Sequence, residues 1–189
     1  MTAMELVLID RDGVLNEDRP DAVKTPDEFK MIPRAAEAVA RLNAARINVA
    51  LATNQSIIGR GIIEQAMLER IHAKLHGELA RAGARLDAIF VAPDAPTGAS
   101  DRRKPGPGML REALSRFGAA PADTPMIGDG LPDLKAAAVA GCRRVLVRTG
   151  KGAATQAAGL PAELLPVAVY EDLWGAVDAL LSAPARIGA

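Results

Sequence analysis

The sequence predicts a three-layer α/β fold of the Rossmann-like kind, with a parallel sheet covered by helices on both faces. Strand-like and helix-like segments alternate along the 189 residues, an order typical of parallel sheets. The first strand-like run, Leu6 to Ile9, is wholly apolar, as expected for a strand buried on both faces. Asp10 and Asp12 follow it directly. Ligands bind at the carboxyl ends of the strands in such sheets, so the two carboxylates mark a candidate site.

One domain is expected over residues 1–183, because 189 residues are too few for two ordinary domains. Residues 184–189 are expected to form a flexible tail. Hydrophobic residues make up 49% of the chain and charged residues 24%, which is a globular composition.

Composition also narrows the class of partner. Nucleic-acid binding is not expected, because only 3% of residues are aromatic and Lys+Arg equals Asp+Glu at 23 each. No apolar run approaches the ~20 residues that a membrane span requires. Cys142 is the single cysteine, and the N-terminus lacks the basic start and apolar core of a signal peptide. We therefore expect a cytoplasmic protein, and a monomer, since nothing in the sequence indicates an obligate interface.

The first half of the chain follows this plan. After the first strand, the polar segment 17–31 is too irregular for a helix and long enough to fold over the sheet edge as a flap. Pro33 then opens a helix over 34–45. A second strand is expected over 47–52, followed by the polar run Thr53-Asn54-Gln55-Ser56. A long helix over 64–82 follows, because its leucines and isoleucine recur at helical spacing.

The second half repeats the alternation. We expect strands over 88–91, 124–127, 144–147 and 167–170, and helices over 108–117, from Pro132 to the residue before Gly141, and over 171–181. The stretch 92–107 is rich in Pro, Gly, Asp and Arg and is predicted to be a loop.

The residues that follow the strands describe a phosphoryl-transfer site. Two carboxylates as close as Asp10 and Asp12 raise each other's pKa unless a cation lies between them, and Mg²⁺ suits a few carboxylates plus a phosphate. Asp10 can attack phosphorus only if a metal and a fixed ammonium offset the repulsion between anions. Asp129 would help to hold the metal, and Lys104 would supply the ammonium.

Two further residues complete the predicted chemistry. Thr53 offers a hydroxyl, and it and Asn54 offer backbone N–H groups, to the phosphate oxygens. Asp12 would protonate the leaving alkoxide and then deprotonate the water that breaks the aspartyl-phosphate, as a general acid/base does.

Four short motifs, in this order, resemble those of the haloacid dehalogenase-like (HAD) phosphatases. They are Asp10-Arg11-Asp12-Gly13-Val14, Thr53-Asn54, Lys104-Pro105 and Gly128-Asp129-Gly130-Leu131-Pro132-Asp133. Each motif by itself is weak, and an isolated Asp-x-Asp is more often a turn and cap pair. Four motifs in the family's order, each at a predicted strand end or loop, make coincidence an inadequate explanation.

Further stretches are similar to the subgroup of histidinol-phosphate and D-glycero-D-manno-heptose 1,7-bisphosphate phosphatases. They are Thr53-Asn54-Gln55-Ser56 followed by Gly59-Arg60-Gly61, then Arg103-Lys104-Pro105 with Pro107 to Leu110, and Arg148 to Gly152. The resemblance covers about residues 5–181 and implies an enzyme with a minimal cap or none. It implies that Asp10 is the nucleophile and Asp12 the acid/base. It also implies that Mg²⁺ binds Asp10, the Asp12 backbone carbonyl and Asp129.

The substrate that this resemblance favours is a small phosphorylated metabolite, D-glycero-D-manno-heptose 1,7-bisphosphate, which would lose its 7-phosphate. Residues that match Arg60 and Arg103 lie near the substrate in the heptose enzymes. Guanidinium groups there would suit a second phosphate. Histidinol phosphate, or another small-metabolite phosphate, is the alternative. A binding module without turnover and a phosphotransferase are weaker alternatives, because the catalytic set is complete and no large cap excludes water.

One departure from the subgroup concerns zinc. Its members usually carry Cys-x-His followed by Cys-x-Cys before the Arg-Lys-Pro, and the matching positions here are Ala92-Pro93-Asp94 and Ser100-Asp101-Arg102. These offer no thiolate or imidazole, so we predict no zinc and a loop held by prolines and local hydrogen bonds.

Three residues keep two interpretations. Asp133 either supports the site from behind the metal ligands or only caps a helix. His72 and His76, four residues apart on one predicted helix, either chelate a metal or flank its apolar stripe in solvent, and the absence of a third ligand favours the second interpretation.

Overall fold

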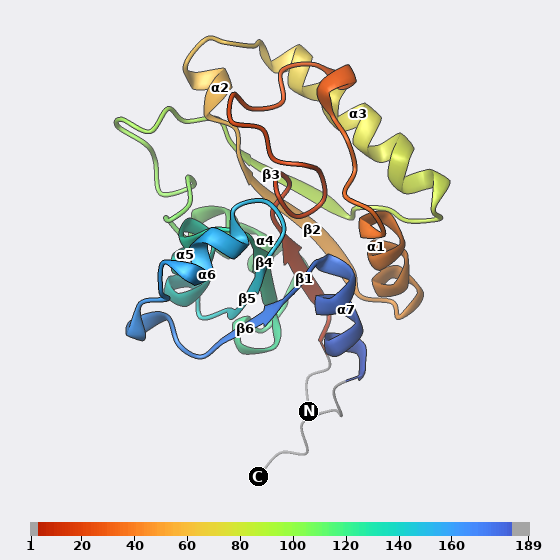
Figure 1. Cartoon of the computed structure of the whole chain (residues 1–189), viewed down its shortest axis with the longest axis vertical. Coiled ribbons are helices and arrows are strands. Elements are labelled where there is room, and N and C mark those ends of the chain that lie inside the picture. The colour runs from red at the N-terminus through yellow and green to blue at the C-terminus, as the bar shows by residue number, and fades with distance from the viewer. Residues whose placement is uncertain (1–3, 183–189) are drawn as a thin grey trace.

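The protein is described by a computed structural model that covers residues 4–182. Its centre is a six-stranded parallel sheet with the strand order β3-β2-β1-β4-β5-β6 (Figure 1). The strands are β1 (Leu6–Ile9), β2 (Asn48–Asn54), β3 (Ala88–Ala92), β4 (Pro125–Gly128), β5 (Arg143–Val147) and β6 (Val167–Tyr170). The chain runs outward from β1 in one direction to β3, then returns to β4 on the other side of β1. The carboxyl end of β1 therefore lies at the reversal of strand order, where open α/β sheets bind ligands.

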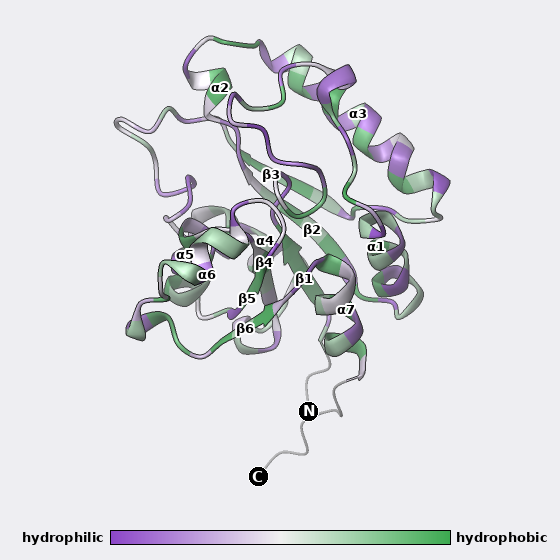
Figure 2. Ribbon diagram, viewed as in Figure 1, coloured by the Kyte–Doolittle hydropathy of each residue, from purple (hydrophilic) through white to green (hydrophobic). Residues whose placement is uncertain are grey.

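Helices cover both faces of the sheet (Figure 1). One face packs against α1 (Ala35–Ala44), α3 (Gln65–Arg81) and α7 (Leu173–Ser182), and the other against α4 (Gly108–Phe117) and α5 (Leu131–Ala140). Along β1, Val7 and Ile9 point into the first core and Leu6 and Leu8 into the second, and all four side chains are fully buried. Burial of each such side chain stabilises the fold by about 1.5–3 kcal/mol. The apolar colouring of the strands in Figure 2 reflects this two-sided burial.

The shorter elements lie in the connections between strands and helices. They are the helices α2 (Ser56–Gly59) and α6 (Gly152–Ala157), and the 3₁₀ turns Pro26–Glu28, Pro121–Asp123 and Ala162–Leu164. These pieces were not predicted, because three to six residues are too few to show a hydrophobic period.

The predicted three-layer fold and all six predicted strands are confirmed. The chief difference in strand bounds is that β2 continues two residues beyond the predicted end. Thr53 and Asn54 stay in the sheet because they pair with Val91 and Ala92 of β3. The described residues contain no second folded unit inserted as a cap. The predicted tail, residues 184–189, lies outside the described residues.

The contact between α1 and α7 lies away from the site described below. The guanidinium groups of Arg34 and Arg41 lie over the Trp174 ring, at 3.9 and 4.6 Å from its centroid. Arg41 also donates to Asp178 at 2.8 Å in an exposed ion pair. Within residues 4–182, no helix combines the length and apolarity needed to cross a membrane.

Candidate active site

Sheet register brings the predicted site residues to one edge. Ile9 lies level with Leu51 of β2 and Ile127 of β4, and the backbone N–H of Asp10 donates to the Ile127 carbonyl at 2.9 Å. Thr53 lies two residues after Leu51, and Asp129 lies two residues after Ile127. Residues scattered over more than 100 positions therefore meet at the carboxyl end of the central strands.

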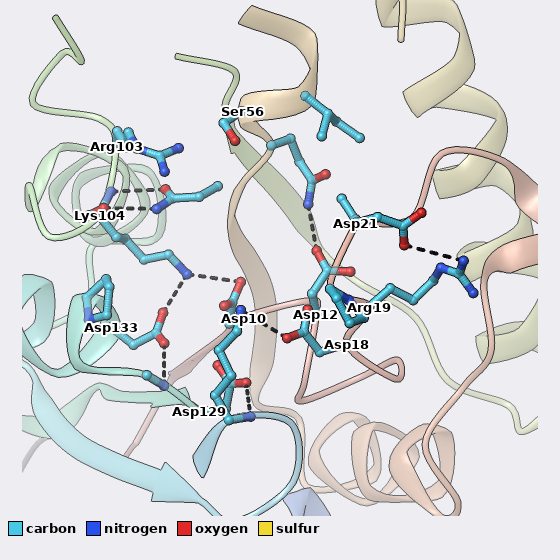
Figure 3. A pocket seen from close by; sticks show the side chains of 18 of the residues that line it. Asp10, Asp12, Asp18, Arg19, Asp21, Ser56, Arg103, Lys104, Asp129 and Asp133 are labelled. Carbon is cyan, nitrogen blue, oxygen red and sulfur yellow. Dashed lines mark hydrogen bonds and ion pairs between the residues drawn. The ribbon is translucent and has the colours of Figure 1, made fainter. Parts of the chain in front are cut away.

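Lys104 places a buried ammonium between two carboxylates. Its Nζ lies 3.0 Å from Oδ1 of Asp10 and 2.6 Å from Oδ1 of Asp133, and the Lys104 side chain is only 2% exposed (Figure 3). Burial by itself would lower the pKa of Lys104, but the two carboxylates outweigh it and raise that pKa to about 12. The ammonium is therefore permanently charged, as a group that offsets phosphate charge must be.

The backbone and side chain of Lys104 are fixed by β2. Nδ2 of Asn54 donates to the Lys104 carbonyl at 2.9 Å, and the Lys104 N–H donates to Oδ1 of Asn54 at 3.0 Å. Nζ also donates to the Ala52 carbonyl at 2.7 Å. Both polar groups of the Asn54 amide are thus used by Lys104, so this side chain acts on the site through the lysine.

Asp133 completes the setting of Lys104. Its Oδ1 accepts from Nζ and its Oδ2 accepts from the Gly130 N–H at 3.1 Å, at the start of α5. Asp133 is 3% exposed. The interpretation of Asp133 as a support behind the site and its interpretation as a helix cap therefore both hold in this structure.

Asp129 lies beneath the loops that carry Gly13 and Gly150. Oδ2 of Asp129 accepts from the Lys151 N–H at 2.8 Å. A Cβ on Gly13 would come within 2.0 Å of that oxygen and a Cβ on Gly150 within 2.2 Å, and both glycines have positive φ. Only glycine allows this close approach in this backbone conformation. Burial is the main cause that raises the pKa of Asp129 to about 6.

The donor set fits a hard divalent cation. Carboxylate oxygens of Asp10, Asp129 and Asp133 lie within 4.8 Å of one another. Oδ1 of Asp10 accepts from the Arg11 N–H at 2.7 Å as well as from Lys104. Within residues 4–182, Oδ2 of Asp10 and Oδ1 of Asp129 accept no hydrogen bond. Burial and the neighbouring carboxylates raise the pKa of Asp10 to about 7 although Lys104 lowers it. A cation between these two free oxygens would relieve that repulsion.

Asp12 is held by donors on both oxygens. Oδ1 accepts from Nδ2 of Asn16 at 2.9 Å, Oδ2 accepts from Nε2 of Gln55 at 2.9 Å, and the guanidinium of Arg11 donates to both. Burial raises the pKa of Asp12, but the charge of Arg11 and the hydrogen bonds from Asn16, Arg11 and Gln55 hold it below its usual range.

Thr53 is oriented by Gln55. The Thr53 side chain is buried, and its Oγ1 accepts from Nε2 of Gln55 at 2.8 Å. Because that oxygen already accepts a hydrogen bond, its own O–H is available to donate to an anion. Sequence reasoning noted Gln55 in the run after β2 but gave it no role.

A cavity of about 560 Å³ is lined by Asp10, Asp12, Asn54, Gln55, Lys104, Asp129 and Asp133, together with Arg60, Arg103 and Lys151. Thr53, which is 1% exposed, is not part of this wall. The predicted flap lies beside this cavity and contributes six lining residues, Asp18, Arg19, Pro20, Asp21, Ala22 and Lys24. Asp18 joins the flap to the loop after β5 through its 2.9 Å ion pair with Nζ of Lys151. NH1 of Arg103 donates to the Asp94 carbonyl at 3.1 Å.

Local hydrogen bonds close the loop between β3 and Lys104. Oδ2 of Asp94 accepts from the N–H of Ser100 at 3.2 Å and also from its hydroxyl. His72 and His76 lie elsewhere: the metal-sized cluster found among residues 4–182 contains neither. His72 is half-buried, and its Nε2 lies 3.4 Å from NH1 of Arg11.

Some contributors could not be read from the sequence. Lys151 sits in the Arg-Thr-Gly-Lys-Gly run that was noted, yet only the fold shows that it lines the cavity. Arg11 and Gln55 belong to noted motifs, but nothing in their spacing indicates contact with Asp12.

Comparison with known proteins identifies the same family along most of the chain. A family model described as HAD-hydrolase-like matches residues 101–176. The chain is 45% identical to a D-glycero-β-D-manno-heptose-1,7-bisphosphate 7-phosphatase of Bordetella bronchiseptica, over 94% of this chain and 98% of that one. It is 43% identical to the Pseudomonas aeruginosa protein of the same name, over 93% and 97%.

Solved structures agree. The D,D-heptose 1,7-bisphosphate phosphatase of B. bronchiseptica, in complex with magnesium and phosphate, superposes with a TM-score of 0.89 at 45% identity, covering 94% of this chain and 98% of that one. The enzyme of Burkholderia thailandensis superposes with a TM-score of 0.74 at 42% identity, covering 95% and 99%. The chain therefore belongs to the HAD-like phosphatases, in the family of the D-glycero-β-D-manno-heptose-1,7-bisphosphate 7-phosphatases.

Proposed function

We propose that this protein is a Mg²⁺-dependent phosphomonoester hydrolase that removes the 7-phosphate of D-glycero-D-manno-heptose 1,7-bisphosphate. The observation that carries the reaction class is the buried ammonium of Lys104, 3.0 Å from Oδ1 of Asp10. The nucleophile and the charge that lets it approach a phosphate dianion are already in place. The names of the full-length relatives support the substrate.

Asp10 and Asp12 divide the chemistry. The phosphate dianion beside Asp12 would raise the pKa of that carboxyl, which Arg11 and the hydrogen bonds hold low in the free protein, so that Asp12 carries a proton in the complex. Oδ2 of Asp10 attacks phosphorus, and the P–O bond to the sugar breaks as Asp12 gives that proton to the leaving oxygen. Asp12 then removes a proton from water, which attacks phosphorus and releases Asp10 and inorganic phosphate. Asp12 can accept that proton because it contacts the cavity and 24% of its side chain is exposed.

The phosphate is held by groups of fixed geometry. Lys104 neutralises part of its charge. The Thr53 hydroxyl, which is buried beside Gln55 and does not line the cavity of the free protein, would donate to a phosphate oxygen that reaches it. Asn54 contributes by fixing Lys104 and by its backbone N–H. Because these donors are set before substrate arrives, little reorganisation is needed during the reaction.

Mg²⁺ would be held by Asp10, Asp129 and the backbone carbonyl of Asp12, and would supply charge neutralisation for the phosphate oxygens. Asp133 stays outside this set because both its oxygens already accept hydrogen bonds. The structure of the B. bronchiseptica relative in complex with magnesium and phosphate supports this choice of cation.

The outer part of the cavity suits a second phosphate. Arg60 and Arg103 line the cavity beside Lys151, whose Nζ pairs with Asp18, and guanidinium groups bind phosphate oxygens through paired hydrogen bonds. Histidinol phosphate, the alternative substrate, would instead bring an ammonium group to this cationic wall. The observation therefore favours a bisphosphate.

The remaining proposals concern partners and location. We propose that the enzyme needs no zinc, because residues 92–103 offer no thiolate or imidazole, and hydrogen bonds between Asp94 and Ser100 close this loop. We also propose a cytoplasmic monomer with a small phosphorylated metabolite as its partner.

Activity measurements test the function directly. The wild-type protein with Mg²⁺ should release phosphate from heptose 1,7-bisphosphate and from an aryl phosphate, and should prefer the bisphosphate to histidinol phosphate. Asp10→Asn should abolish all turnover. Asp178→Asn, which changes an exposed carboxylate near α1, should leave activity unchanged. Turnover of the aryl phosphate by Asp10→Asn at the wild-type rate would show that Asp10 is not the nucleophile.

A further inference from the structure

Arg11 is a buried arginine whose shortest side-chain contacts are with Asp12. Its NH2 lies 2.9 Å from Oδ2 and 3.0 Å from Oδ1 of Asp12, and its Nε lies 3.3 Å from Oδ1. The Arg11 side chain is 0% exposed. The guanidinium therefore grips the carboxylate in a two-point contact that fixes the carboxylate plane.

Arg11 cannot act on the substrate directly. It has no exposed surface and does not contribute to the cavity wall, whereas Asp12 does. A contribution to stability also explains the presence of Arg11 poorly, because the desolvation of a buried ion pair costs about as much free energy as the attraction within the pair supplies. Its effect on the reaction must pass through Asp12.

Two side chains hold the guanidinium in turn. Oε1 of Gln55 accepts from NH2 of Arg11 at 3.2 Å, while Nε2 of Gln55 donates to Asp12 and to Thr53. On the other side, Nε2 of His72 lies 3.4 Å from NH1 of Arg11. As Arg11 offers only donors, His72 must present an unprotonated Nε2.

The arrangement connects α3 to the reacting groups. His72 belongs to α3, which packs on the sheet face that also receives Val7 and Ile9. Burial, together with the nearby charge of Arg11, lowers the pKa of His72 to about 4. The ring is thus neutral at ordinary pH and can accept from Arg11.

We propose that Arg11 is a positioning residue for Asp12, held in place by Gln55 and His72, and that it aims the Asp12 carboxyl group at the leaving-group oxygen. The inference rests on the proposed function. In the first step Asp12 gives its proton to the ester oxygen as the P–O bond breaks. A guanidinium that fixes the carboxylate plane keeps that proton within hydrogen-bond reach of the oxygen.

Leaving groups of different basicity distinguish a role of Arg11 in orienting Asp12 from a role in general stability. A strongly acidic phenol departs from phosphorus without a proton, whereas a weakly acidic phenol or an alcohol needs one. A wrongly oriented Asp12 should therefore slow the hydrolysis of esters with poor leaving groups more than that of esters with good ones. A merely structural defect should slow both equally.

The experiment measures kcat/KM for aryl phosphates whose phenols have pKa values from about 5 to about 10. This ratio reports the steps up to departure of the phenol. Arg11→Lys keeps the charge but loses the planar fork. It should lower kcat/KM about 10- to 100-fold for the least acidic phenol and less than about 3-fold for the most acidic one. Arg41→Lys, at the remote pair with Asp178, should match wild type throughout.

Substitutions at His72 provide a second test in case Arg11→Lys does not fold, which its thermal transition will show. His72→Leu removes the acceptor for NH1 and should steepen the dependence on leaving-group pKa in the same direction. His72→Gln keeps an acceptor and should restore a dependence close to that of wild type.

A parallel fall of kcat/KM across the whole series in Arg11→Lys, or no fall, would overturn the inference. For His72, equal behaviour of the Leu and Gln variants would do the same. Absence of turnover by the wild-type protein would instead reject the proposed function, and the inference with it.

Discussion

Replacement of Asp10 by Asn should stabilise the metal-free protein while it abolishes activity. In the folded protein, burial and the charges of Asp133, Asp12 and Asp129 raise the pKa of Asp10 to about 7 from its ordinary value of 3.8, although Lys104 lowers it. The folded state therefore holds a proton between these values that the unfolded state releases. The contribution of Asp10 to the free energy of unfolding falls as pH rises from about 4 to about 7.

The structure gives the size of this effect. A tenfold change in proton affinity is worth about 1.4 kcal/mol, so a rise from 3.8 to about 7 corresponds to about 4 kcal/mol above pH 7. Asn carries no charge to bury, and relaxation of Lys104 and Asp133 reduces the difference. We expect Asp10→Asn to raise the free energy of unfolding by about 1–4 kcal/mol at pH 8. Each kcal/mol corresponds to about 2–4 °C in Tm.

Thermal unfolding in EDTA at pH 8 and at pH 4 measures this difference. The gain should be present at pH 8 and absent at pH 4, where Asp10 is protonated in the folded state. Added Mg²⁺ at pH 8 should raise the Tm of wild type more than that of the variant, because the variant lacks one metal ligand. Asp178→Asn serves as the control and should show no gain in Tm over wild type at pH 8. A variant less stable than wild type at pH 8 in EDTA would refute the electrostatic reasoning.

Two further substitutions test other parts of the site. Lys104→Met removes the ammonium that pairs with Asp10 and Asp133, so kcat/KM for an aryl phosphate should fall about 10²–10³-fold. Chemical denaturation should show that the free energy of unfolding falls by about 3–5 kcal/mol. Unchanged stability would contradict the importance of the buried ion pairs. Gly13→Ala places a methyl group 2.0 Å from Oδ2 of Asp129 and should raise the Mg²⁺ concentration needed for half-maximal activity. Gly61→Ala has a similar positive φ in open space, so it should cost about 1–3 kcal/mol of stability without a change in that concentration; equal metal dependence in the two variants would show that the contact with Asp129 is unimportant.

Much of the fold could be predicted because each strand has a recognisable apolar pattern in its local sequence. β1 is an unbroken apolar run with a carboxylate at its end, and a strand buried on both faces requires that pattern. The bounds were less accessible. Thr53 and Asn54 are polar, so the sequence indicates that β2 ends before them, whereas pairing with β3 keeps both in the sheet.

The site divides in the same way. Asp10, Asp12, Lys104 and Asp129 could be identified as candidates, because the proposed chemistry needs a nucleophile, a proton carrier, an ammonium and a metal ligand near the strand ends. The structure brings all four to the edge of one cavity. Asn54 was predicted to bind phosphate, and the structure shows that its side chain holds Lys104, while its N–H remains a proposed contact. Side-chain partners of this kind depend on which loops meet.

By itself the sequence determined the fold class and the reaction class, and it indicated the carboxylates proposed to perform the reaction, because these depend on residue type and order along the chain. Only the tertiary structure decided which residues hold those carboxylates. Arg11 lies beside Asp12 in sequence, yet its other partners come from positions 55 and 72. Those contacts arise from the packing of α3 on the sheet and the turn after β2, which no local pattern records. Distances across the fold, not spacing along the chain, set the direction and protonation of each group.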